Sequence, residues 1–164
     1  MDLTEIISDD VEWIAPEASV ADAVERFARA PAGAVCLLVG DGHAEPRGIV
    51  TAFDLLRAAE CTAVKPGRVS RGGAVAETVR PEDLSRPAIF DEMACAGAKA
   101  QVREVMSSPV ACVQAHASLA EVMDLLIRRR IDAVPVLRGA RVAGIVHRRG
   151  LVDALARAMG ARRA

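Results

Sequence analysis

The feature that most constrains the fold of this chain is a sequence that occurs twice. Shifted by 99 residues, the stretch 14–38 matches the stretch 113–137. A loop that is three residues longer in the first copy then changes the shift to 96, and Gly48-Ile49-Val50 meets Gly144-Ile145-Val146. Because the match extends over about fifty residues, we interpret it as a duplication in which both copies fold alike.

Each copy predicts the same order of elements, β-α-β-β-α. The first helix of each copy begins at a capping serine that is followed three residues later by an acid, Ser19 with Asp22 and Ser118 with Glu121. Apolar residues then recur at helical spacing, and short apolar runs bounded by polar turns indicate strands. The expected elements are 11–14, 20–30, 34–39, 48–50 and 53–60, then 109–113, 119–130, 133–137, 144–146 and 150–159. This order predicts an α+β fold with parallel and antiparallel neighbours and helices on one face.

The repeats divide the chain into three parts. Residues 1–60 form the first repeat and residues 102–164 form the second. Between them, residues 61–101 are an insertion in which Pro and Gly mark loops and a helix is plausible over 87–99. We expect this insertion to be either a helical element docked on, or swapped between, the repeats, or a partly mobile segment.

The composition excludes several classes of protein. Hydrophobic residues make up 52% of the 164 residues, which is enough for a core and excludes global disorder. No run of 18 apolar residues occurs, and the acidic start is unlike a signal peptide, so we expect a soluble, cytoplasmic protein with no membrane contact. Aromatic residues make up only 2%, which leaves little for stacking single-stranded nucleic acid.

Charge is distributed unevenly although the net charge is only −1. Residues 1–60 carry a net charge of −8, residues 61–101 carry +1, and residues 102–164 carry +6. The two halves could attract each other across an interface, or the basic half could face an anion. Nucleic acid is an unlikely partner, and salt dependence of binding would test it.

Cysteine and histidine give no sign of a metal site or of catalysis. The four cysteines form no CxxC pair, the three histidines are isolated, and neither a P-loop nor GxGxxG occurs. Cys36 and Cys112 stand in apolar runs, so we expect them to be buried as small hydrophobic residues. The sequence therefore predicts neither an enzyme nor a bound cofactor or metal.

The repeated pattern resembles a tandem CBS-domain protein, a Bateman module, named after cystathionine β-synthase. The resemblance is carried by Val105-Met106-Ser107-Ser108-Pro109-Val110, Ile131-Asp132-Ala133-Val134-Pro135-Val136, Val142-Ala143-Gly144-Ile145-Val146 and Gly48-Ile49-Val50-Thr51-Ala52-Phe53-Asp54-Leu55. It implies two repeats packed about a pseudo-two-fold axis with their sheets apposed. It also implies a regulatory site for AMP, ADP, ATP or S-adenosylmethionine between the repeats, where the ligand shifts a conformational equilibrium and no reaction occurs.

The resemblance implies specific ligand-binding residues. In the family, a Gly-h-h-Thr-x-x-Asp segment holds the ribose and the phosphates, and here Thr51 and Asp54 complete it. In the second copy His147 and Gly150 replace them, so we predict one nucleotide site per chain. The other repeat would complete this site with Pro109, Val110, Ala111, Arg130, Ile131, Asp132, Ala133 and Pro135, and Arg149 would reach a phosphate on a facing module.

Alternative roles are open for some of these residues. Asp54 could serve only as the first-turn acid of its helix, and Thr51 could be an ordinary hydroxyl at a strand end. Asp132 near a phosphate favours a ligand with few phosphates, or an Asp132 side chain that turns away. We expect a homodimer that signals to a separate effector protein. The alternative is an interaction module that dimerises without binding any ligand.

Overall fold

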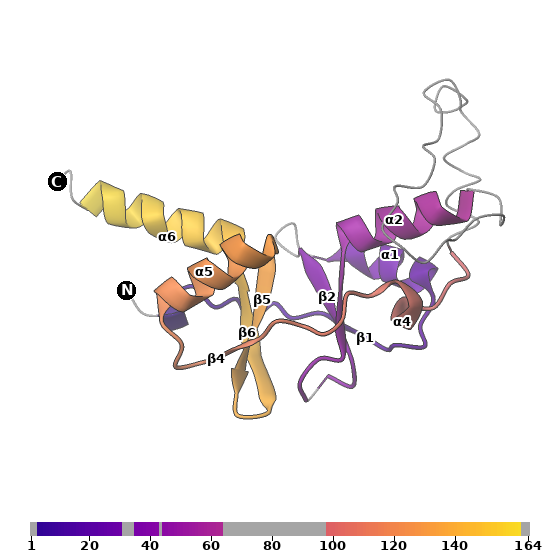
Figure 1. Cartoon of the computed structure of the whole chain (residues 1–164), viewed down its shortest axis with the longest axis horizontal. Coiled ribbons are helices and arrows are strands. Elements are labelled where there is room, and N and C mark those ends of the chain that lie inside the picture. The colour runs from indigo at the N-terminus through magenta and orange to yellow at the C-terminus, as the bar shows by residue number, and fades with distance from the viewer. Residues whose placement is uncertain (1–2, 31–34, 43, 64–97, 162–164) are drawn as a thin grey trace, which may run out of the picture.

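The computed structural model describes residues 3–30, 35–42, 44–63 and 98–161. The predicted helix 87–99 lies almost entirely outside this part of the chain, and so does most of the insertion predicted over 61–101. The described residues form two halves of the same architecture that stand side by side (Figure 1).

Each half follows the predicted order β-α-β-β-α. In the first half the elements are β1 (Trp13–Ile14), α1 (Val20–Arg29), β2 (Cys36–Val39), β3 (Gly48–Thr51) and α2 (Ala52–Ala63). In the second half they are β4 (Val113–Gln114), α5 (Leu119–Arg129), β5 (Ala133–Arg138), β6 (Arg141–His147) and α6 (Arg148–Ala161). A 3-10 helix η1 (Leu3–Glu5) and a short helix α4 (Val102–Val105) precede the two halves. The predicted duplicated α+β fold is confirmed.

The two sheets have the same topology. β1 is parallel to β2 and β2 is antiparallel to β3, and the same relations hold for β4, β5 and β6. A parallel pair needs a crossover, which α1 and α5 provide. The four long helices lie along one edge of the molecule and the two hairpins extend to the opposite edge (Figure 1).

The sheet register corrects our alignment of the two copies. Cys36 pairs with Thr51 in the first sheet, and Ala133 pairs with His147 in the second. Cys36 is therefore equivalent to Ala133, a shift of 97, whereas the sequence match kept a shift of 99 up to Leu38. Two of the three extra residues of the first copy thus precede β2 and one follows it. The sequence alignment of the two copies was wrong here because small apolar residues of buried strands match at several shifts. Only the pairing of the strands fixes the register.

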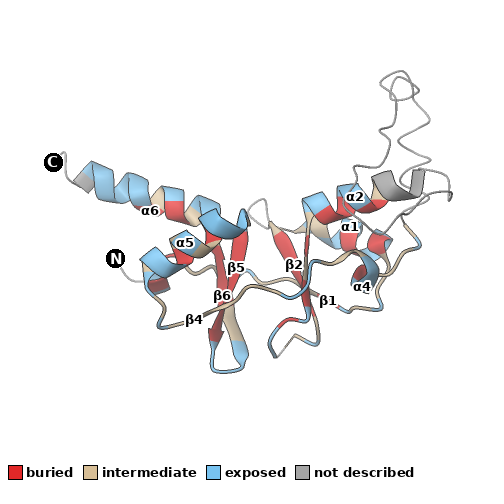
Figure 2. Cartoon of the chain, in the orientation of Figure 1, coloured by how far each residue is buried: buried red, intermediate tan, exposed pale blue. Residues whose placement is uncertain are grey.

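The two sheets face each other through a shared core. β2 is buried on both faces, so its residues alternate between the helices of its own half and the opposite sheet. The cluster between the sheets joins Cys36 and Leu38 to Ala133 and Ile145. Figure 2 shows these central strands as the most buried part of the fold. The apposition of the sheets and the burial of Cys36, which is 3% exposed, are confirmed. The expected burial of Cys112 is wrong, because this residue is only half-buried.

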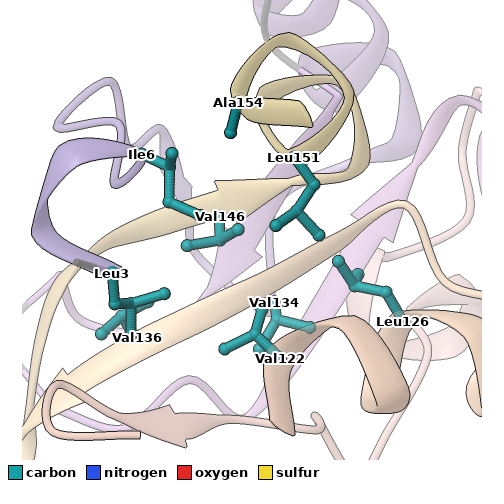
Figure 3. Close-up of a cluster of buried hydrophobic side chains, with 9 residues drawn as sticks. All are labelled: Leu3, Ile6, Val122, Leu126, Val134, Val136, Val146, Leu151 and Ala154. Carbon is teal, nitrogen blue, oxygen red and sulfur yellow. The ribbon is translucent and has the colours of Figure 1, made fainter. Parts of the chain in front are cut away.

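The halves also exchange short segments. Leu3 and Ile6 precede the first half but pack in the core of the second, against residues such as Val136 and Val146 (Figure 3). In the same way Val102 of α4, which the sequence division counts with the second repeat, lies fully buried in the core of the first half. Each core thus depends on a segment from outside its own half, while the division into 1–60, 61–101 and 102–164 stays a prediction about the repeats.

Glycines permit the close approach of these exchanged segments. Ser8 pairs with Ile145 of β6, and Ser107 pairs with Ile49 of β3. At Gly144, with a φ of 155°, a Cβ atom would lie 2.7 Å from the carbonyl oxygen of Ser8. At the equivalent Gly48, a Cβ atom would overlap the side chain of Met106. A side chain at either position would push the exchanged segment away from the sheet.

Candidate functional site

A cleft of about 570 Å³ opens between the two halves, and we call it the Asp54 cleft. Its first-half wall is the end of β3 and the start of α2, and its second-half walls are the segments before β4 and β5. Its lining residues are Ile49, Thr51, Phe53, Asp54, Ser107, Pro109, Val110, Ala111, Arg129, Arg130, Ile131, Asp132 and Ala133. The volume lies within the range of small-molecule sites, about 300–1,000 Å³.

Asp54 is the buried charged residue of this cleft. Asp54 is only 4% exposed, and no other polar or charged residue in the described part of the chain is as buried. Oδ2 accepts hydrogen bonds from the backbone N–H of Thr51 at 2.9 Å and from its hydroxyl at 2.7 Å. Oδ1 accepts one from the hydroxyl of Ser107 at 3.1 Å. A carboxylate offers about four acceptor positions, so this network leaves Oδ1 able to accept another hydrogen bond.

The Thr51–Asp54 pair is also a helix cap. The backbone N–H of Asp54 donates to the Thr51 hydroxyl at 3.3 Å, which completes a reciprocal arrangement at the start of α2. The predicted caps Ser19–Asp22 and Ser118–Glu121 have the same geometry and are confirmed. The acids of those two caps are exposed, whereas Asp54 is buried in a cleft. Capping thus explains the hydrogen bonds between Thr51 and Asp54, but neither the hydrogen bond from Ser107 nor the place of Asp54 in the cleft.

The structure brings nine of the eleven predicted site residues together in the Asp54 cleft. These nine are Thr51, Asp54, Pro109, Val110, Ala111, Arg130, Ile131, Asp132 and Ala133. Pro135 is buried inside β5, where it pairs with Ile145, and it does not line the cleft. Arg149 lies at the start of α6 and lines a neighbouring cavity instead.

This neighbouring cavity has a volume of about 630 Å³, and we call it the axial groove. Its lining residues are Phe27, Val35, Thr51, Ala52, Phe53, Asp132, His147, Arg148, Arg149 and Val152. Within it, Arg148 Nη2 lies 3.1 Å from Asp132 Oδ1 and donates a hydrogen bond to the carbonyl oxygen of Ile131 at 3.0 Å. The charge of Asp132, which the sequence placed near the ligand, is therefore paired with a cation of its own half.

The second half lacks the polar groups of the Asp54 site. His147 stands where the first half has Thr51, and Gly150 stands where it has Asp54. The Nδ1 atom of His147 is buried without a hydrogen-bond partner, and burial lowers the pKa of this imidazole despite the opposing effect of Asp10. Because position 150 is a glycine, it offers no carboxylate that could accept hydrogen bonds from a sugar.

The comparison with protein families identifies the repeats. The sequence profile of the CBS domain matches residues 3–60 and residues 102–157. The chain belongs to the CBS-domain family. The two matched segments make it a tandem CBS-domain protein, and the resemblance noted in the sequence is confirmed. No curated protein matches the chain in sequence.

Solved structures share the fold of this CBS pair. CBSX2, solved in complex with AMP, is 17% identical, with a TM-score of 0.64 over 96% of this chain and 98% of its own. The CBS domain of a CBS-domain-containing membrane protein from Sphaerobacter thermophilus is 22% identical, with a TM-score of 0.64 over 93% and 86%. The cytosolic domain of the Mg2+ channel MgtE, solved with ATP, is 15% identical, with a TM-score of 0.59 over 93% and 48%. At these identities the likeness establishes the fold alone.

Reasoning from the sequence missed several residues of the CBS pair's cleft. Ser107 donates to Asp54 from the other half, and Phe53, Ile49 and Arg129 add to the lining. The repeat held one signal, because Ser107 is equivalent to Ser8 by the shift of 99. Arg148 carried no signal, since its ion pair with Asp132 depends on how α6 begins.

Residues 3–30, 35–42, 44–63 and 98–161 contain no group of three or more His, Cys, Asp or Glu side chains that could hold a metal ion. Among the helices that the structure describes, none has the length and apolar sequence required to cross a membrane.

Proposed function

We propose that this CBS pair is a regulatory module that binds an adenosine-containing ligand in the Asp54 cleft. The observation that carries the proposal is a buried carboxylate, Asp54, at the wall of a cleft whose opposite wall is largely apolar. A carboxylate accepts hydrogen bonds from the two hydroxyls of a ribose, and an apolar wall takes the face of a purine. No residue arrangement in the cleft calls for chemistry on the ligand, and CBS domains are typically regulatory and non-catalytic.

The walls of the cleft fit the parts of such a ligand. Pro109, Val110, Ala111 and Ile131 provide apolar contacts for the base. Arg130, whose left-handed conformation ends α5, lines the same cleft and carries a charge suited to a phosphate. The AMP complex of CBSX2 and the ATP complex of the MgtE cytosolic domain show adenine nucleotides bound to proteins of this fold. AMP, ADP, ATP and S-adenosylmethionine are the ligands to compare.

We propose one ligand per chain. In the second half, His147 and Gly150 replace the hydroxyl and the carboxylate, so a ribose would find no carboxylate there. An acidic residue also changes the wall of the equivalent position in the second half. By the shift of 99, Asp10 stands where the Asp54 cleft has Pro109. This negative charge disfavours a phosphorylated ligand in the second half.

We propose that the module acts as a homodimer in the cytoplasm and passes its state to a separate effector protein. The helices carry large apolar side chains that are at least 47% exposed, namely Val24, Phe53, Leu56, Ile127, Val152, Leu155 and Met159. These helices share one edge of the molecule (Figure 1). A second copy placed head to tail would cover this edge and bring the half with net charge −8 against the half with net charge +6.

Isothermal titration tests the proposed function. AMP, ADP, ATP and S-adenosylmethionine are titrated into the wild type, Asp54→Ala and the control Asp22→Ala. The control removes the acid of a cap that has the same geometry but is exposed and lies on α1. We expect one ligand per chain, an affinity about ten- to a hundred-fold lower in Asp54→Ala, and no change in Asp22→Ala. Two ligands per chain would contradict the single site.

The second candidate is an interaction module that binds no ligand. The observation that favours it is the cap geometry of Thr51 and Asp54, which satisfies three hydrogen bonds without any ligand. If the protein is a folded dimer but gives no binding heat with any of the four compounds, the proposed ligand-binding function is wrong and the interaction module is favoured.

A further inference from the structure

The Asp54 cleft and the axial groove adjoin each other. Thr51, Phe53 and Asp132 line both cavities, so a molecule that fills the first can extend past the start of α2 into the second. Together the two cavities exceed the volume that a nucleoside needs, and they leave room for a polar tail.

The axial groove lies on the pseudo-two-fold axis of the chain. Equivalent positions of the two halves face each other across it, Thr51 with His147 and Ala52 with Arg148. The sheet register also makes Val35 equivalent to Asp132, a residue that lies in the same groove. The duplication therefore places two copies of the same surface opposite each other.

The two sides of the groove differ in charge. Where the second half has Asp132 and Arg148, the first half has the apolar residues Val35 and Ala52. Arg149 also lines the charged side, where its Nε atom lies 3.0 Å from Asp153 of the same helix. Arg148 pairs instead with Asp132, which lines both cavities, so of these two cations Arg148 is the one that adjoins the Asp54 cleft. Its side chain is 53% exposed, so an anion can reach it.

We propose that the axial groove receives the phosphoryl groups beyond the first of a nucleotide held at Asp54, and that Arg148 determines this specificity. This inference rests on the proposed function. A phosphate tail carries more charge than the Asp132 carboxylate and takes its place on the guanidinium, whose planar fork suits phosphate oxygens. The module then prefers ADP and ATP to AMP.

Binding of a nucleotide series to matched variants tests the inference. Adenosine, AMP, ADP and ATP are titrated without divalent metal into the wild type, Arg148→Gln and Asp132→Asn. Arg157→Gln is the control, since Arg157 is exposed on the same helix and lines neither cavity. In Arg148→Gln we expect affinity for ADP and ATP to fall about tenfold, and affinity for adenosine and AMP to change less than about twofold. Asp132→Asn, which removes the competing carboxylate, should bind ADP and ATP more tightly than the wild type.

The outcomes separate this inference from the proposed function. A wild type that binds AMP and ATP equally, with no change in Arg148→Gln, overturns the inference and leaves the Asp54 site intact. If Arg148→Gln lowers the affinity for all four compounds equally, the arginine only supports the structure, and the inference is also overturned. A wild type that binds neither these compounds nor S-adenosylmethionine refutes the proposed function itself. Thermal unfolding of each variant checks that a loss of binding does not come from a loss of folding.

Discussion

The hydroxyl of Ser107 donates a hydrogen bond of 3.1 Å to Oδ1 of Asp54, a residue 53 positions away in the other half of the chain. This bond joins the exchanged segment before the second half to the cap of α2 in the first. The candidate ligand site is therefore also a point where the exchanged segment is fixed to the first half. Occupying the site can change how the exchanged segment is held, which is the kind of coupling that a regulatory module needs.

Ser107→Ala should lower the free energy of unfolding by about 1.5–3 kcal/mol, because it removes a hydrogen bond to a buried carboxylate. Ser108→Ala is the control. Its hydroxyl donates to the neutral carbonyl oxygen of Arg47 at 3.0 Å, so its loss should cost only about 0.5–1 kcal/mol. Urea unfolding of the two variants measures both values, and equal losses would show that the bond to Asp54 has no special weight.

Gly144→Ala should destabilise the fold more than Gly48→Ala. At Gly144 the new Cβ atom would meet the backbone of Ser8, which cannot move without breaking its pairing with Ile145. At Gly48 it would meet the flexible side chain of Met106. We expect a loss of about 2–3 kcal/mol for the first variant and about 1 kcal/mol for the second, measured by urea unfolding. A larger loss at Gly48 would contradict this account of the exchanged segments.

His147 should make the stability depend on pH. Burial lowers the pKa of His147 in the folded state below its ordinary value of 6.5, so the unfolded chain binds the proton more readily. Its contribution to stability is therefore fully present above about pH 6.5 and is lost as the pH falls through the folded pKa.

Urea unfolding between pH 8 and pH 5 measures this effect in His147→Gln and in the control His116→Gln, which changes an exposed histidine. We expect the first variant to lose less stability on acidification than the wild type, and the second to follow the wild type. Parallel curves for all three proteins would show that His147 is not the titrating group.

The sequence predicted the parts of this structure that depend on local chemistry. Ser19 and Ser118 were predicted to cap their helices, and they do, because a hydroxyl and an acid three residues later satisfy free backbone groups with no help from the rest of the fold. The order of strands and helices also followed from local sequence, namely from the spacing of the apolar residues along the chain.

The parts that the sequence did not predict depend on contacts between distant segments. The register of β2 could not be derived because all four of its residues are buried, which removes the alternation that fixes a register. The packing of Leu3 in the second core was missed, since an apolar residue fits either half. For the site, the resemblance to the CBS family indicated Thr51 and Asp54, but the hydrogen bond of Ser107 and the ion pair of Arg148 required the assembled halves.

The most direct test of the central claim is a chemical double-mutant cycle between Asp54 and the ribose hydroxyls. The dissociation constants of AMP and of 2′,3′-dideoxy-AMP are measured for the wild type and for Asp54→Asn. We predict that removing the hydroxyls weakens binding at least about tenfold in the wild type and less than about twofold in the variant. An equal loss in both proteins would show that Asp54 does not hold the ribose and would contradict the proposed site.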